Sequence, residues 1–142
     1  MKSMDIRVTL HIAKPPATVA RTMFDPSKDS SWIGGVLMAE FLVGRAMSVG
    51  GRVRRLGSIL GRPFSCVTEI IAHGANRHLV MRFVEGPLKG EVSYDIVPTM
   101  SGSVVRIRKN VSSNFRIPGM GWLLRRSFRP DLQRLKAIVE SD

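Results

Sequence analysis

The chain has 142 residues, of which 44% are hydrophobic and 23% charged, with one cysteine and a formal net charge of +11. This composition is typical of a globular protein and excludes an internal disulfide, a cysteine-cluster metal site and a low-complexity fold. Because no stretch has the roughly 20 apolar residues of a transmembrane helix and the N-terminus lacks the apolar run of a signal peptide, we expect one cytoplasmic domain over residues 1–142.

The first predicted elements are a strand and a helix. Residues 5–12 alternate apolar and polar side chains, which is the period of a half-buried strand. The proline pair at 15–16 suits the first turn of a helix, where a missing backbone N–H costs nothing, and apolar residues follow at helical spacing up to Phe24. The turn-rich segment 25–31 should end this helix before Trp32.

Six further strands are predicted between residues 36 and 111. Turn signals rich in Gly, Pro and Asn separate them. Because the loops between consecutive strands are short, the strands should form an antiparallel meander. The expected ranges are 36–42, 51–60, 64–72, 78–84, 90–97 and 103–111.

The last segment changes to a helical period. Apolar residues recur every three or four positions from Met120 to Val139, which predicts a helix of roughly 20 residues with one apolar stripe, bent at Pro130. One face of the sheet is the only large partner that can bury this stripe. We therefore expect an α+β helix-grip architecture. In it, a curved antiparallel sheet of about seven strands wraps around a long C-terminal helix, with one or two short helices after the first strand.

This order of elements, together with four motifs, resembles the START-like superfamily, also called SRPBCC, of the polyketide cyclase/dehydrase and lipid-transport type. The motifs are IAKPPATVARTMFDPSKDSSW (12–32), SVGGRVR (48–54), CVTEIIAHGANRHLVMRF (66–83) and DLQRLKAIVE (131–140). The resemblance implies an apolar cavity between sheet and helix that holds lipids, sterols, polyketides, quinones or plant hormones. Some members are enzymes and others only bind or carry, so the fold does not decide the activity.

Strand alternation selects the residues that should face this cavity. The expected apolar and aromatic ligand contacts are Trp32 at the rim, Phe64, Met81, Phe83, Tyr94, Leu124 and Phe128. Plain core packing is the alternative for each of them. The Tyr94 hydroxyl needs a partner, which a cavity water, a ligand oxygen or the backbone can supply.

Two cations, Arg55 and Lys109, fall on the same inward face. A buried cation needs a carboxylate, either from the acidic head of a ligand or from the protein, where Glu69 is a candidate. The alternative is a register slip at a nearby glycine that brings the side chain to water. Charges on the opposite face of the sheet should form solvated cross-strand pairs.

The last helix carries basic residues beside its apolar stripe. Trp122, Arg125, Arg126 and Arg129 suit an anionic membrane surface, and a solvated helix face is the alternative. Nucleic acid is a rival partner for a chain of this charge, but the sequence has no recognition motif and no aromatic ladder for stacking.

Catalytic motifs are absent from the sequence, which has no phosphate loop, nucleophile elbow, HExxH or histidine pair at metal-ligand spacing. We expect no metal and no cofactor. The favoured function is non-catalytic binding or transport of an apolar small molecule, lipid-, polyketide- or quinone-like, with an acidic head group as an option. A cyclase or aromatase using the same cavity is the alternative, because one placed acid or base leaves no motif. A basic surface protein for membranes or nucleic acid is the second alternative.

Overall fold

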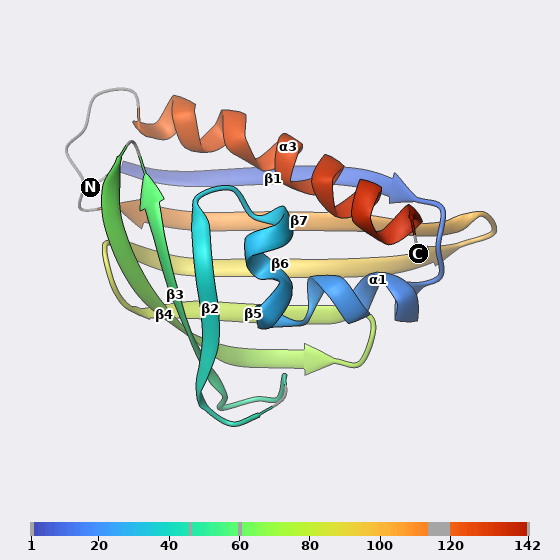
Figure 1. The fold of residues 1–142 in the computed structure, drawn as a ribbon, viewed down its shortest axis with the longest axis horizontal. Helices are drawn as coiled ribbons and strands as arrows, with labels where there is room; N and C mark the ends of the chain where they lie inside the picture. The colour runs from blue at the N-terminus through green and yellow to red at the C-terminus, as the bar shows by residue number, and fades with distance from the viewer. Residues whose placement is uncertain (1, 46, 60, 114–119, 142) are drawn as a thin grey trace.

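The computed structural model describes residues 2–45, 47–59, 61–113 and 120–141, with residues 2, 3, 59, 113 and 120–129 described by their backbone alone. Seven antiparallel strands form one sheet in the order β1-β7-β6-β5-β4-β3-β2 (Figure 1). The strands are β1 (Lys2–Ile12), β2 (Val36–Val43), β3 (Arg52–Ile59), β4 (Arg62–Gly74), β5 (His78–Glu85), β6 (Leu88–Thr99) and β7 (Gly102–Ser113). The predicted α+β class and strand count are confirmed.

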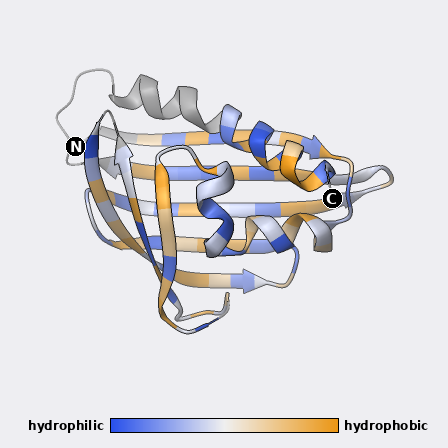
Figure 2. Cartoon of the chain, in the orientation of Figure 1, coloured by the Kyte–Doolittle hydropathy of each residue, from blue (hydrophilic) through white to orange (hydrophobic). Residues whose placement is uncertain are grey.

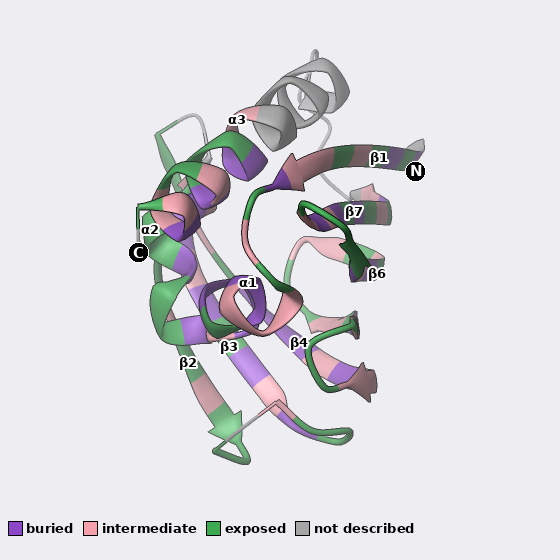
Figure 3. Cartoon of the chain, turned by 90° about the vertical axis from the view of Figure 1, so that its right-hand side faces the viewer, coloured by how far each residue is buried: buried purple, intermediate pink, exposed green. Residues whose placement is uncertain are grey.

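The helices lie together on one side of this curved sheet (Figures 1 and 3). They are α1 (Pro16–Met23), the 3-10 helix η1 (Pro26–Lys28), α2 (Asp29–Trp32) and α3 (Met120–Glu140). Because β1 pairs with β7, the chain between β1 and β2 has to cross from one edge of the sheet to the other, and α1, η1 and α2 make this crossing. The helix after the first strand and the long last helix are confirmed.

Local chemistry explains the ends of the short helices. Pro16 begins α1 at a position where the missing N–H has no partner to lose. Asp25 caps η1, since its carboxylate accepts hydrogen bonds from the backbone N–H of Ser27 at 3.0 Å and from the Ser27 hydroxyl at 2.7 Å. α2 follows η1 without a gap, and β2 begins after residues 33–35.

The core lies between the inner face of the sheet and the helices. The second half of α3 contributes Leu132, Leu135 and Val139, each 0% exposed. In β6, Val92 and Ile96 are buried, and hydrophobic and hydrophilic residues alternate along the strands (Figure 2). The first half of the predicted stripe, from Met120 to Phe128, has side chains that lie outside the described residues.

The strands extend further than the apolar pattern predicts. For example, β4 is longer than the expected 64–72 and β6 is longer than the expected 90–97. Backbone pairing continues into polar and turn-like residues, such as the pairing of Thr99 with Gly102, where no buried side chain marks the strand. The register slip considered as an alternative does not occur in the pairing of β3 with β4, which runs continuously from Arg52 to Ile59, although the pairing of β2 with β3 shifts between Val36 and Met38, opposite Gly57.

Candidate functional site

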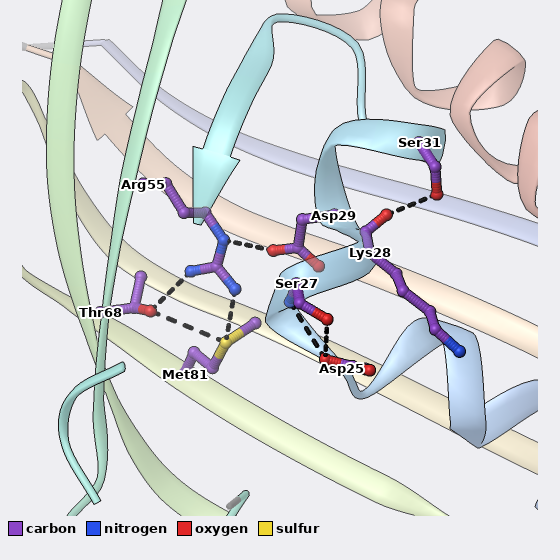
Figure 4. Close-up of polar contacts among 8 residues, drawn as sticks. All are labelled: Asp25, Ser27, Lys28, Asp29, Ser31, Arg55, Thr68 and Met81. Atoms are coloured by element: carbon purple, nitrogen blue, oxygen red, sulfur yellow. Dashed lines mark hydrogen bonds and ion pairs between the residues drawn. The ribbon is translucent and has the colours of Figure 1, made fainter. Parts of the chain in front are cut away.

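A buried ion pair joins the sheet to α2. In β3, Val53 and Arg55 are 0% and 7% exposed, whereas Arg54 between them is exposed, so the predicted inward position of Arg55 is confirmed. The Arg55 Nε donates to Asp29 Oδ2 at 2.7 Å, and the side chains are 9% and 2% exposed (Figure 4). Since both charges are removed from water, each depends on the other for compensation.

Glu69, the partner considered for Arg55, belongs to the other face of the sheet. Its carboxylate forms ion pairs with Arg52 at 3.3 Å and with Arg82 at 3.1 Å, and these arginines are 43% and 52% exposed. The prediction of Glu69 as an internal partner was therefore wrong. Its position in β4 is one residue from the inward Thr68, and alternation points the two side chains in opposite directions.

Thr68 and Met81 complete the surroundings of the Arg55 guanidinium (Figure 4). The Arg55 Nη1 donates to Thr68 Oγ1 at 2.8 Å, and Nη2 lies 3.5 Å from Met81 Sδ. The Thr68 hydroxyl donates in turn to the same sulfur at 3.7 Å. Met81 is thus a weak acceptor of this network as well as an apolar wall residue.

A second buried carboxylate fixes α2 to α3. Asp131 Oδ1 accepts a hydrogen bond from the backbone N–H of Gly34 at 2.9 Å and also contacts the Arg134 guanidinium. The Arg134 Nε donates to the backbone carbonyl of Trp32 at 3.1 Å. A Cβ added at Gly34 would lie 2.9 Å from Arg134 Nη2, so the absence of a side chain permits this close approach. The segment that carries Trp32 is therefore held from both sides.

Trp32 ends an aromatic row inside the protein. Its ring centroid lies 5.8 Å from that of Tyr94, which stacks at 6.5 Å on Phe24. Trp32 is 1% exposed, so it is enclosed rather than placed at an open edge, and Tyr94 points inward as predicted. The Trp32 indole Nε1 is buried and has no hydrogen-bond partner among the described residues. Such a donor costs roughly 1–3 kcal/mol when it is left unsatisfied.

The buried groups influence one another's protonation. Burial raises the pKa of Asp29 more than Arg55 lowers it, and burial also raises the pKa of Asp131. Burial lowers the pKa of Arg55, but Asp29, Tyr94 and Cys66 together raise it above its ordinary value. Burial lowers the pKa of Lys109 to about 8 and raises the pKa of Tyr94. The half-buried Lys109 amine thus titrates near pH 8.

Comparison with known proteins places the chain in a family. The family described as "Polyketide cyclase / dehydrase and lipid transport" matches residues 3–140. The chain belongs to this family. No curated protein matches the sequence.

Solved structures with the same fold cover most of the chain. TTHA0849 from Thermus thermophilus is 18% identical with a TM-score of 0.77, covering 97% of this chain and 98% of its own. Major latex-like protein 151 from Panax ginseng is 14% identical with a TM-score of 0.72, covering 96% and 97%. DynU16, from the dynemicin biosynthetic locus, is 17% identical with a TM-score of 0.69, covering 96% of this chain and 47% of that one. The predicted helix-grip fold and START-like resemblance are confirmed.

In this family member, the structure brings four of the predicted contact residues together. Arg55 contacts Met81, and Trp32 packs on Tyr94, whose hydroxyl interacts electrostatically with Arg55. Lys109 is half-buried on β7 and also interacts electrostatically with Arg55. Phe64 and Phe83 are half-buried, and Phe83 packs against the main core. The remaining predicted contacts have side chains outside the described residues: Trp122, Leu124, Arg125, Arg126, Phe128 and Arg129.

Asp29, Asp131 and Thr68 were missed by the sequence reasoning. Alternation along β4 could have found Thr68, which shares the inward face with Cys66 and Ile70, but no local pattern marks the two acids. Within the described ranges, no helix combines the length and apolarity that crossing a membrane requires. The same ranges contain no group of His, Cys, Asp and Glu that is arranged to hold a metal ion.

Proposed function

We propose that the protein binds an apolar small molecule between the inner face of the sheet and α3. The observation that carries this proposal is the Arg55–Asp29–Thr68 network, which lies beside the apolar core. A buried ion pair is on balance no more stabilising than apolar side chains of the same volume. A binding site for an apolar molecule, by contrast, combines apolar walls with a few fixed polar groups.

The same contacts favour binding or carriage over catalysis. Arg55 is engaged by Asp29, and Asp131 is engaged by Gly34 and Arg134. Groups that already hold one another form a preorganised wall and have little freedom to exchange protons with a ligand. The family description, which includes lipid transport, supports a ligand of the apolar class.

A panel of fatty acids, sterols, quinones and aromatic polyketides tests this proposal by native mass spectrometry and thermal unfolding. A ligand at one hundred times its dissociation constant adds roughly 2.7 kcal/mol to folding stability. In a domain of this size, that gain raises Tm by several degrees. We expect at least one class to give this shift together with a one-to-one complex. A panel in which no class binds would refute the proposal.

Lys109 favours a second candidate, an enzyme of the cyclase type. Ring closure of a poly-β-ketone requires removal of a proton from carbon, and a base works best when its pKa lies near the working pH. The pKa of Lys109, lowered to about 8 by burial, meets that condition. Under this candidate, a linear triketone is cyclised by the wild type and not by Lys109→Met, while the exposed-site variant Arg54→Met retains activity. If the protein is only a carrier, none of the three proteins (wild type, Lys109→Met and Arg54→Met) cyclises the triketone.

A further inference from the structure

The proposed function does not specify the chemical class of the ligand, but the buried residues indicate one. Resting on that function, we infer that the ligand is neutral and carries a hydrogen-bond-accepting carbonyl oxygen that Trp32 Nε1 binds. This differs from the carboxylic acid anchored by Arg55 or Lys109 that the sequence suggested. Three features of the interior carry the inference.

The first feature is the indole N–H of Trp32. Indole is a hydrogen-bond donor only, and buried donors in proteins nearly always have an acceptor. Trp32 is 1% exposed, and its Nε1 has no acceptor among the described residues. A ligand oxygen placed against this atom would satisfy the donor, whereas a hydrocarbon would leave it unsatisfied.

The second feature is the fixed position of this donor. The backbone carbonyl of Trp32 accepts from Arg134 at 3.1 Å, and two residues later Gly34 donates to Asp131 at 2.9 Å. At the other end of α2, Asp29 is bound to Arg55. Because these contacts oppose a shift of α2, the indole cannot easily turn to find an acceptor within the protein. A rigid donor of this kind selects the ligand by position.

The third feature is the balance of charge. Among the described residues, Asp29 pairs with Arg55 at 2.7 Å and Asp131 contacts the Arg134 guanidinium, so each of these carboxylates is already matched by an arginine. A ligand carboxylate at Arg55 would stand beside Asp29 and repel it, which is costly in a low-dielectric region. A neutral carbonyl leaves the balance intact.

The row of rings beside the donor indicates the shape of the ligand. Trp32, Tyr94 and Phe24 have successive centroid distances of 5.8 and 6.5 Å, with the last two stacked. Aromatic faces at these separations favour flat, conjugated neighbours in offset or edge contacts. An aryl ketone or another conjugated carbonyl compound therefore combines both requirements.

Three compounds of nearly equal shape test the inference by isothermal titration: 1-ethylnaphthalene, 1-acetonaphthone and 1-naphthoate. The wild type should bind the ketone about tenfold more tightly than the hydrocarbon, the size of one net hydrogen bond. It should bind the carboxylate more weakly than the ketone. Trp32→Phe, which keeps a ring but removes the donor, should reduce the advantage of the ketone to less than twofold. The exposed-site variant Arg54→Met should retain it.

The outcomes separate this inference from the proposed function. Tightest binding of 1-naphthoate, or an undiminished ketone advantage in Trp32→Phe, overturns the inference and leaves the proposed function standing. If the hydrocarbon binds as tightly as the ketone, the inference again fails alone. If none of the three compounds binds, the inference fails, and the panel of fatty acids, sterols, quinones and polyketides decides the proposed function separately. Should Trp32→Phe not fold, the indole N–H resonance of Trp32 decides instead: it moves downfield with the ketone and not with the hydrocarbon if the inference holds.

Discussion

Arg54 and Arg55 are neighbours on β3, and we expect their replacement by Met to have very different effects. Each guanidinium lies 2.7 Å from a carboxylate, so the two ion pairs match in distance. They differ in burial: the side chains of Arg54 and Glu40 are both 44% exposed, whereas those of Arg55 and Asp29 are 9% and 2% exposed. The pair of variants therefore compares an exposed ion pair with a buried one.

The expected magnitudes follow from the environment of each charge. An exposed pair contributes at most about 1 kcal/mol, so Arg54→Met should change the free energy of unfolding by that amount or less. Arg55→Met leaves the Asp29 carboxylate buried without its cation, which should cost about 3–5 kcal/mol. The double variant Arg55→Met/Asp29→Leu should recover most of the loss, because apolar side chains replace both charges.

The pH dependence of Arg55→Met gives an independent check. Burial already raises the pKa of Asp29 in the folded protein, and loss of the guanidinium raises it further. A carboxyl whose folded pKa lies above its unfolded value binds more protons in the folded state, so its contribution to stability is present at low pH and lost as pH rises through the folded pKa. The loss of unfolding free energy in Arg55→Met relative to the wild type should therefore become smaller as pH falls from 7 to 4.

Guanidinium chloride denaturation with linear extrapolation measures these differences. The double-variant cycle also yields the coupling energy between the two residues. If Arg55→Met and Arg54→Met lower the free energy of unfolding by amounts that differ by less than about 1 kcal/mol, the reasoning is contradicted. A double variant no more stable than Arg55→Met would also contradict it.

Three other substitutions probe the surroundings of the site. The folded pKa of Lys109 is lowered to about 8, so the unfolded chain binds more protons than the folded protein at alkaline pH. As pH rises from 8 to 10.5, the wild type should therefore gain up to about 3 kcal/mol of unfolding free energy relative to Lys109→Met, measured by urea unfolding. A difference that stays constant with pH would count against the burial of Lys109. Gly57→Ala should lower Tm, because the new Cβ would lie 2.0 Å from a backbone carbonyl oxygen. Gly74→Ala should leave Tm unchanged, because the nearest atom to its Cβ would be 3.7 Å away. Equal changes in Tm would refute this steric explanation. Asp131→Ala removes the acceptor of the Gly34 N–H and should speed hydrogen exchange of that amide, and unchanged protection would exclude its role in holding α2.

Alternation along β5 to β7 predicted which side chains are buried, because a strand packed on one face must repeat every two residues. Met81, Tyr94 and Ile107 are inward and at most 4% exposed, and Arg82 and Arg108 are outward. The apolar stripe of the last helix similarly predicted the burial of its second half. Both patterns depend only on the spacing of residues along the chain, so they can be recognised in a single sequence.

The partner of Arg55 could not be found in the same way. Alternation in β3 places Arg55 inside but says nothing about which distant segment lies over it. Asp29 belongs to a polar run that reads as a turn, and only the return of the chain across the sheet brings α2 onto β3. In the sequence, Asp131 is likewise an ordinary polar residue of a predicted helix, and only the folded structure brings the Gly34 N–H to its carboxylate. Tertiary placement, rather than local pattern, therefore decides the polar part of the site.

The indole N–H of Trp32 offers the most direct test of a carbonyl-bearing ligand between the sheet and α3. In ¹⁵N-labelled protein, comparison with Trp122→Phe assigns the two indole signals. Titration with 1-acetonaphthone should move the Trp32 signal downfield and to saturation, as expected for a donor that gains an acceptor. A Trp32 signal that stays fixed while the ketone binds elsewhere, or a spectrum that does not change at all, would contradict the account.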